Sequence, residues 1–362
     1  MQGMRRRCGL SVLCALLLVQ VLAGCSVGGP TEGRQSPGAG AHGKQVVAAS
    51  IPYYDQRRGF EVAVQHTDLF TDISFWWYSV LPDGSIGLLD QPYTKVKPRL
   101  VRELQSHGIR VIPNIANYSQ GEWTPGNASV VLRDPVRRSK HVRNIVDLVL
   151  REGYDGIDID YESLQDGDRQ PLVVFLTDLG AALHAQNKLL TISVQPKESD
   201  AGDGPHNRAQ DYAAIGKVVD RVNVMSYDYS YSGSDPGPVA PIDWVDRVLA
   251  YTTSQIQPEK VVLGNDLLGY DWGRGGGETV TWQEATDLAD KNGADVQWDE
   301  DSQSPWFRYR GADGPHEVWF ENAESTAVKL DLVEKYHLGG TFFWRLGGED
   351  PDTWSRIEPL LQ

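Results

Sequence analysis

The stretch YDGIDIDYE, at positions 154–162, decides both the fold class and the chemistry expected of this chain. Successive side chains of a β-strand point to opposite faces, so Asp158, Asp160 and Glu162 share one face and the apolar residues between them share the other. The three carboxyl groups would stand about 6.6 Å apart along the strand. Asp155 falls on the wrong face for this set, and we interpret it as a strand-start residue that supports the site.

Three acidic side chains on one interior face are energetically expensive. Like charges in a medium of low dielectric constant cannot all stay ionised, so at least one of the three carboxyl groups must hold a proton at neutral pH. The three could in principle bind a divalent cation. Hard-cation sites usually draw oxygens from several elements, however, and no second acidic cluster accompanies this one. The pattern therefore predicts an acid–base site without a metal.

Short apolar runs alternate with helical patterns on both sides of this segment. Amphipathic helices are predicted between the runs, as at 98–108, 135–153 and 169–188. Eight strands alternating with helices predict an α/β fold, a (β/α)8 barrel. An open doubly wound sheet is the alternative, but its first strand would normally end in a glycine-rich phosphate turn, which is not present at 51–59. The predicted strands are 46–54, 72–80, 109–115, 156–162, 189–195, 220–228, 260–266 and 340–346.

The connection between the last two predicted strands is longer than the helix and two loops that a barrel requires. It contains a helical pattern at 281–293, followed by alternating runs around the turn sequence GADGP at 311–315. The GRGGG run at 273–277 is interpreted as a flexible loop, because it lacks the context of a phosphate-binding loop. We expect a small α+β insertion at about 270–322, between strands seven and eight, that forms one wall of the barrel mouth.

The central segment resembles a family signature. DGIDIDYE at 155–162 resembles the D-G-x-D-x-D-x-E motif of glycoside hydrolase family 18, the chitinase-like (β/α)8 enzymes. MSYD at 225–228 resembles the M-x-Y-D motif of that family, and Trp344 resembles the tryptophan beneath its sugar subsite. The expected insertion resembles the extra α+β domain of the family. The resemblance covers residues 46–362, which we expect to form one catalytic barrel.

The resemblance implies catalytic roles. Glu162 would be the general acid/base, and no residue of the enzyme would act as nucleophile, because the 2-acetamido group of the substrate attacks the anomeric carbon. Asp160 would orient the acetamido N–H, and Asp158 would share a proton with Asp160. Tyr227 would donate its hydroxyl to the acetamido oxygen. No cofactor is implied.

A second set of residues is expected to bind substrate. The resemblance implies this role for Trp344, for Met225 and for Asp228. Gln195 and Tyr53 are candidates because each lies at the carboxyl end of a predicted strand, where barrel enzymes place their active sites. Aromatic residues near the ends of the first two strands can pack on sugar rings, which gives four candidates: Tyr53, Tyr54, Trp76 and Trp77.

The chain also departs from the family pattern. Many chitinases carry an S-x-G-G motif on the third strand, where this chain has IPNIANYS at 112–119. The run at 316–347 looks closer to the spore-cortex-lytic branch, which cleaves peptidoglycan. We expect a retaining glycosidase acting on β-linked N-acetylglucosamine glycans, either peptidoglycan or chitin-type. The alternative is a non-catalytic lectin on the same barrel, although such lectins typically lose the acid at the position of Glu162. The mode of cleavage, endo or exo, and the oligomeric state stay open.

Composition limits the classes of partner. The chain has 362 residues with 34 Lys and Arg against 49 Asp and Glu, a net charge of −15. This balance argues against nucleic acid as a partner, because nucleic-acid binding needs a basic face. The only cysteines are Cys8, Cys14 and Cys25, so no disulfide framework is expected in the folded body.

The amino-terminal residues indicate export. Arg5–Arg7 and the apolar run 10–22 are typical of a signal peptide, which we place at 1–24. LAGC, ending at Cys25, resembles the lipobox of bacterial lipoproteins, in which the cysteine is lipidated. Residues 25–45, rich in Gly, Pro and Ser, would then form a flexible tether. We expect an exported protein held on the cell membrane by a lipid anchor, facing the cell wall or the outside. A plain secretory signal is the alternative.

Overall fold

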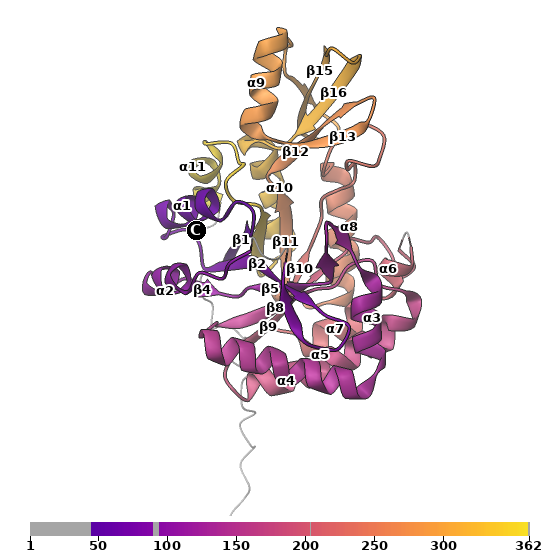
Figure 1. Ribbon diagram of the computed structural model, residues 1–362. Helices are drawn as coiled ribbons and strands as arrows, with labels where there is room; N and C mark the ends of the chain where they lie inside the picture. The colour runs from indigo at the N-terminus through magenta and orange to yellow at the C-terminus, as the bar shows by residue number, and fades with distance from the viewer. Residues whose placement is uncertain (1–44, 90–93, 203, 361–362) are drawn as a thin grey trace, which may run out of the picture. The chain divides into compact units, whose positions relative to one another are not determined.

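The computed structural model describes residues 45–89, 94–202 and 204–360, so the expected signal peptide and Cys25 lie outside the described residues. Eight parallel strands close into a barrel in the order β1-β17-β11-β10-β9-β8-β5-β2, and β2 pairs with β1 (Figure 1). This confirms the predicted (β/α)8 barrel. The strands are β1 (Val46–Pro52), β2 (Asp72–Val80), β5 (Asn114–Ala116), β8 (Gly156–Asp160), β9 (Leu189–Val194), β10 (Arg221–Val224), β11 (Val261–Asp266) and β17 (Gly340–Trp344).

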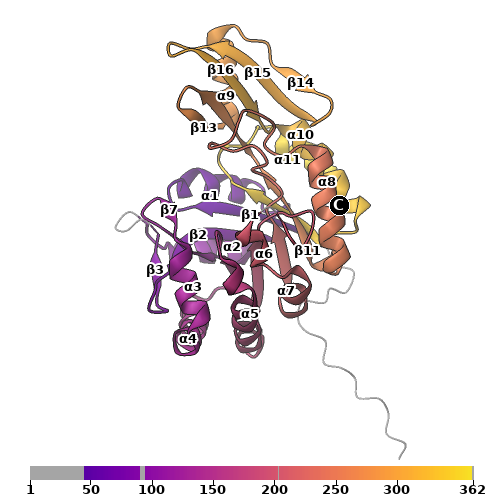
Figure 2. The same cartoon turned by 90° about the vertical axis from the view of Figure 1, so that its right-hand side faces the viewer.

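The helices cover the outside of the barrel, and the long helices such as α4 and α5 bury an apolar face. Figure 2 shows α3, α4 and α5 side by side on this outer layer. No helix in the described ranges is long and apolar enough to cross a membrane. The α-helices of the barrel are α1 (Gln56–Gln65), α2 (Pro98–Ser106), α3 (Pro125–Arg133), α4 (Pro135–Glu152), α5 (Arg169–His184), α6 (Pro205–Arg208), α7 (Tyr212–Val218), α8 (Ile242–Gln255), α10 (Ala323–Lys335) and α11 (Thr353–Ile357).

Several strands are shorter than the apolar runs predicted. β8 stops at Asp160 and β10 at Val224, so Glu162 and the segment 225–228 lie just beyond the carboxyl ends of their strands. The third predicted strand is split into β4 (Arg110–Val111) and β5, because Pro113 between them has no N–H to donate to a neighbouring strand. Glu162 and the polar residues of 225–228 therefore lie at the barrel mouth and not within the sheet.

The chain leaves the barrel after β11 and forms a separate five-stranded antiparallel sheet with one helix packed on it (Figure 1). This confirms the α+β insertion between the seventh and eighth barrel strands. The sequence predicted a flexible loop at 273–277, and this was wrong. The run joins two paired strands through a tight turn, in which Gly276 has a φ of 102°. The elements are β12 (Leu268–Gly273), β13 (Gly276–Thr281), α9 (Trp282–Asn292), β14 (Gln297–Asp299), β15 (Ser304–Arg310) and β16 (Pro315–Phe320).

The minor strands lie at the rim of the barrel. β3 (Ile86–Leu88) pairs antiparallel with the end of β2, and β6 (Tyr118–Ser119) pairs with β7 (Glu122–Trp123) just after β5. The second pair brings aromatic side chains over the barrel mouth, where the acidic residues of β8 emerge.

Candidate active site

Three carboxyl groups line the interior of the barrel at the end of β8. Asp158 and Asp160 are buried inside the barrel, and Glu162 is partly buried just past the strand. The residues that alternate with them, Ile159 and Tyr161, are buried on the opposite face against the helices. The alternation expected for the segment is therefore present in the structure.

Asp158 is the deepest of the three and the most fully bonded. Thr191 and Ser193 of β9 donate hydroxyl hydrogen bonds to it at 2.5 and 2.8 Å. Asn223 of β10 adds an amide hydrogen bond at 3.1 Å. Burial raises the pKa of Asp158 to about 6, although these three hydrogen bonds favour the charged form. Asp158 can therefore take up or release a proton near neutral pH.

Asp160 has one bonded and one free oxygen. Asn114 of β5 donates to its Oδ2 at 3.1 Å, while the buried Oδ1 has no hydrogen-bond partner among the described residues. Burial raises the pKa of Asp160 well above its usual range, and the charge of Asp158 raises it further. The pair therefore favours holding a proton, and Oδ1 is left for a hydrogen bond to a ligand.

Glu162 is held through its main chain and its side chain. Asn117 accepts from Glu162 N at 2.8 Å and donates to Glu162 O at 2.7 Å, and Gln195 donates to Glu162 Oε2 at 2.6 Å. Burial raises the pKa of Glu162 well above its usual range, and the charges of Asp160 and Asp228 add to the effect. A carboxyl group that keeps its proton to higher pH than an ordinary Glu and is fixed in place can act as a general acid.

The segment after β10 faces these carboxyl groups. Tyr227 is buried, and burial raises the pKa of its hydroxyl well above the usual range, with the charge of Asp266 adding to it. The phenol therefore stays a hydrogen-bond donor. Asp228 accepts from Tyr270 of the insertion at 2.8 Å, which brings the insertion to the site. Met225 is buried and packs in the barrel core.

A group of aromatic rings lies at the carboxyl ends of β1, β2 and β17. Trp344 ends β17 and meets Trp76 of β2 edge to face, with ring centroids 5.5 Å apart. Trp76 also contacts Tyr53 at 5.4 Å and Tyr118 at 5.1 Å. Such ring faces can pack against the C–H faces of sugars.

The remaining aromatic candidates divide between mouth and core. Tyr54 is 55% exposed beside Tyr53, with the guanidinium of Arg345 5.1 Å from its ring centre. Trp77 is fully buried on the other face of β2, stacked on Phe75 at 4.0 Å. Trp77 therefore packs the layer between strands and helices and does not line the mouth.

The structure does not bring Asp155 to the site. Asp155 lies at the amino end of β8, where its Oδ2 accepts from Val111 N at 2.8 Å and from Gln105 at 2.9 Å. Because the strand separates it from Glu162, its contacts hold β4 and α2 to β8. Asp155 therefore fixes the amino end of β8 and does not contact the catalytic residues at the other end.

Sequence reasoning overlooked several polar residues of the site, among them the three that bond Asp158 (Thr191, Ser193 and Asn223). Asn114 and Asn117 lie in the stretch 112–119, which the sequence marks only as a departure from the family motif. Asp266 ends β11 in register with Trp344, and burial raises its pKa well above the usual range. Each is a polar residue within or just beyond a predicted strand, which is the signal that could have found it.

The described residues contain no group of three His, Cys, Asp or Glu side chains that could hold a metal ion, and we assign no metal ligands.

A family model described as Glycosyl hydrolases family 18 matches residues 49–350. The Cortical fragment-lytic enzyme of Bacillus subtilis (strain 168) is 32% identical over 274 residues, 74% of this chain and 63% of that protein. This chain therefore spans less than two thirds of that relative.

Solved structures agree with the family match. A chitinase from Chromobacterium violaceum ATCC 12472 has a TM-score of 0.81 at 30% identity, over 88% of this chain and 99% of that one. The Bacillus cereus spore cortex-lytic enzyme SleL has a TM-score of 0.80 at 27% identity, over 88% of this chain and 75% of that one. With its barrel matched almost from end to end, the chain is a glycoside hydrolase and belongs to family 18 of the glycosyl hydrolases.

Proposed function

We propose that this protein is a retaining glycosidase that hydrolyses β-linked N-acetylglucosamine glycans, with the 2-acetamido group of the substrate as the nucleophile. One observation carries the proposal. Glu162, whose pKa is raised, is fixed at the barrel mouth beside Asp160, whose buried Oδ1 has no partner in the described part of the chain. The first group can donate a proton to a leaving sugar, and the second can accept the N–H of an acetamido group.

The reaction would proceed in two displacements. Glu162 gives its proton to the glycosidic oxygen while the acetamido carbonyl oxygen attacks the anomeric carbon, so the glycosidic bond breaks and an oxazolinium ion forms. Asp160 accepts the acetamido N–H, and Tyr227 donates to the acetamido oxygen. The Glu162 carboxylate then removes a proton from water as the water opens the oxazolinium ring. Two inversions at one carbon retain the β configuration.

The substrate class follows from the acetamido route and the aromatic mouth. Peptidoglycan and chitin both contain β-linked N-acetylglucosamine, and the relatives include a cortical fragment-lytic enzyme and a chitinase. The similarity of the run 316–347 to the spore-cortex-lytic branch favours peptidoglycan fragments. Rings such as Trp76 and Trp344 would pack against the sugars at the site.

Turnover of chito-oligosaccharides and of purified peptidoglycan, followed by mass spectrometry, tests the proposal. We expect products ending in N-acetylglucosamine whose new anomeric centre is β when NMR first detects it, and inhibition by a thiazoline analogue of the sugar. Inversion at the anomeric carbon would reject the acetamido route. Binding of oligosaccharide without turnover by the unsubstituted protein would favour the lectin alternative.

We also propose that a lipid on Cys25 anchors the protein to the cell membrane, with the barrel facing the cell wall or the outside. This proposal rests on the lipobox-like sequence before Cys25 and on the Gly/Pro/Ser-rich stretch after it. Cys25→Ala should move the protein from the membrane fraction to the soluble fraction and abolish labelling by a fatty-acid analogue. Persistence of both in the variant would contradict the anchor.

A further inference from the structure

The side chain of Gln195 makes the two oxygens of Glu162 unequal. Gln195 follows the carboxyl end of β9, and its Nε2 donates to Glu162 Oε2 at 2.6 Å. An amide N–H can only donate, so Oε2 must accept. When Glu162 is protonated, its proton is then carried by Oε1, the oxygen that Gln195 does not occupy.

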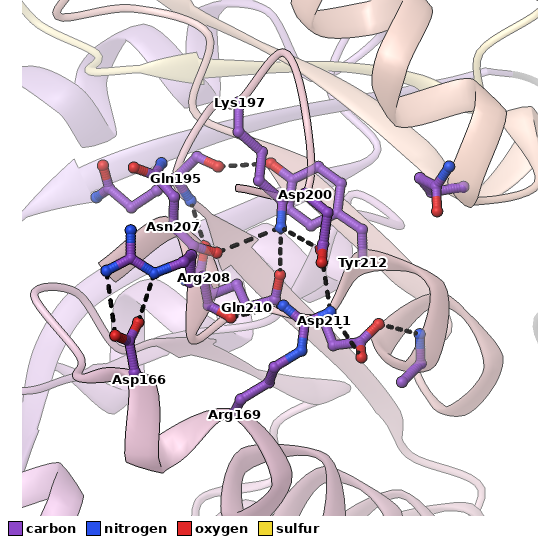
Figure 3. A network of polar contacts seen from close by, with 12 residues as sticks. Asp166, Arg169, Gln195, Lys197, Asp200, Asn207, Arg208, Gln210, Asp211 and Tyr212 are labelled. Carbon is purple, nitrogen blue, oxygen red and sulfur yellow. Dashed lines mark hydrogen bonds and ion pairs between the residues drawn. The ribbon is translucent and has the colours of Figure 1, made fainter. Parts of the chain in front are cut away.

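The main chain of Gln195 is fixed on both sides. Its N–H donates to Gln210 Oε1 at 2.8 Å, and its carbonyl accepts from the hydroxyl of Tyr212 at 2.5 Å (Figure 3). The carbonyl of the next residue, Pro196, accepts from Asn207 at 2.9 Å. Three hydrogen bonds therefore hold the main chain of residues 195 and 196, from which the Gln195 side chain projects.

A buried cation closes this network. The side chain of Lys197 is fully buried, and its Nζ donates to the carbonyls of Gln210 at 2.6 Å and Asn207 at 3.2 Å (Figure 3). Nζ also lies 4.4 Å from the ring centre of Tyr212, and Asp200 is 3.4 Å away. Burial lowers the pKa of Lys197, because a desolvated ammonium is costly. Its two hydrogen bonds to main-chain carbonyls tie residues 207–210 to the strand end that bears Gln195.

We propose that Gln195 is a positioning residue of the acid catalyst: it fixes the Glu162 carboxyl group and places the transferable proton on Oε1, and the Lys197–Gln210 network holds Gln195 in that pose. This inference rests on the proposed role of Glu162 as general acid. It changes the expected role of Gln195 from binding the substrate to orienting the residue that reacts with it.

The pH dependence of activity separates these roles. Glu162 faces Asp160 from β8 and Tyr227 and Asp228 from the segment after β10, all of which disfavour its charge or are neutral. The hydrogen bond from Gln195 works in the opposite direction, because it favours the charged form. Its loss should raise the pKa of Glu162. Since the acid must be protonated to act, the alkaline limb of kcat/KM should then move to higher pH while the maximum falls.

Gln195→Met tests the proposal, because Met has nearly the same length and no donor. On chito-oligosaccharides we expect kcat/KM to fall about ten- to a hundredfold, within the contribution of general acid catalysis, with the alkaline limb shifted upward. On a dinitrophenyl glycoside, whose leaving group needs no proton, kcat/KM should stay near that of the unsubstituted protein. Gln283→Met is the matched control, since Gln283 donates to Asp287 at 2.8 Å on the exposed face of α9.

Two results would overturn the proposal. A rise in KM with unchanged kcat and an unchanged alkaline limb would mean that Gln195 binds substrate. Equal losses on both substrates, with no shift in the alkaline limb, would mean a purely structural role. Lys197→Met should reproduce the Gln195→Met pattern more weakly if it folds, as judged by circular dichroism.

A direct titration separates this inference from the proposed function. The pKa of Glu162 can be followed by 13C NMR of labelled Glu side chains, with the resonance assigned through Glu162→Gln. A higher pKa in Gln195→Met supports the positioning contact even if the unsubstituted protein shows no turnover, in which case the proposed function alone fails. An unchanged pKa overturns the contact whatever the activity.

Discussion

Asp158, Asp160 and Glu162 are chemically similar carboxylic acids in an unfolded chain, and their neighbours in the barrel make them different. Asp158 accepts three hydrogen bonds, Asp160 accepts one and keeps a free buried oxygen, and Glu162 is gripped through its main chain at the rim. Burial raises the pKa of each. Glu162 is the outermost of the three, so its proton is the one that a substrate at the barrel mouth would meet.

Replacing Glu162 by Gln should remove the proton donor while leaving the shape of the site intact. We expect kcat/KM on chito-oligosaccharides to fall by about a hundredfold to ten-thousandfold, which is the usual contribution of general acid–base catalysis. The dissociation constant of an oligosaccharide, measured by calorimetry, should change little. Activity of the variant within tenfold of the unsubstituted protein would show that another group supplies the proton.

Asp158 should make folding stability depend on pH. Its pKa of about 6 in the folded chain lies above the ordinary Asp value of 3.8, so the folded state binds the proton more tightly. The stabilisation is complete below pH 4 and is lost as the pH rises through 6, by about 3 kcal/mol in total. We expect the difference in free energy of unfolding between the unsubstituted protein and Asp158→Asn to shrink by about this amount between pH 3 and 7, as measured by urea titration. A difference that is constant with pH would contradict the raised pKa.

At the scale of the elements, the alternation along 154–162 was sufficient to predict the acidic face of β8, because it depends only on local geometry. The polar partners of that face were not predictable in the same way. Asn114 lies opposite Asp158 in the β5–β8 register, and Asn117 reaches Glu162 across the same pair of strands. Register is a property of two strands together, so a single stretch of sequence shows the polar residue without showing what it bonds.

Asn117 offers a test of this cross-strand support. Its fully buried amide holds both main-chain groups of Glu162, so Asn117→Ala should leave a buried N–H and C=O unpaired. We expect unfolding in urea to show a loss of about 1–3 kcal/mol, together with a fall in kcat as Glu162 moves. Asn292→Ala on α9, which removes one exposed hydrogen bond to Leu288, should change neither quantity appreciably. Full activity of Asn117→Ala with lowered stability would show that the clamp serves folding alone.

Across the whole molecule, the two ends of the barrel have different tasks. The carboxyl ends of the strands hold the acids and the aromatic rings, while the amino ends hold an ion cluster that joins strands from different parts of the barrel. Asp72 of β2 is buried there and accepts from Arg110 of β4 at 3.0 Å and from Arg221 of β10 at 2.9 Å. In barrels of this type, the first end carries activity and the second carries stability.

Asp72→Ala should therefore lower stability and leave catalysis intact. The substitution leaves the largely buried guanidinium of Arg221 without its partner, a change that typically costs about 3–5 kcal/mol. We expect the urea midpoint to fall accordingly, while kcat on chito-oligosaccharides at 25 °C stays within about twofold, because no group at the carboxyl end has moved. Lys140→Ala is the control: Lys140 pairs with Asp83 at 2.8 Å on the surface, where such a pair contributes less than about 1 kcal/mol. A loss of kcat in Asp72→Ala at unchanged stability would mean that the two ends are coupled, and the division of the barrel into a reactive end and a stabilising end would then be wrong.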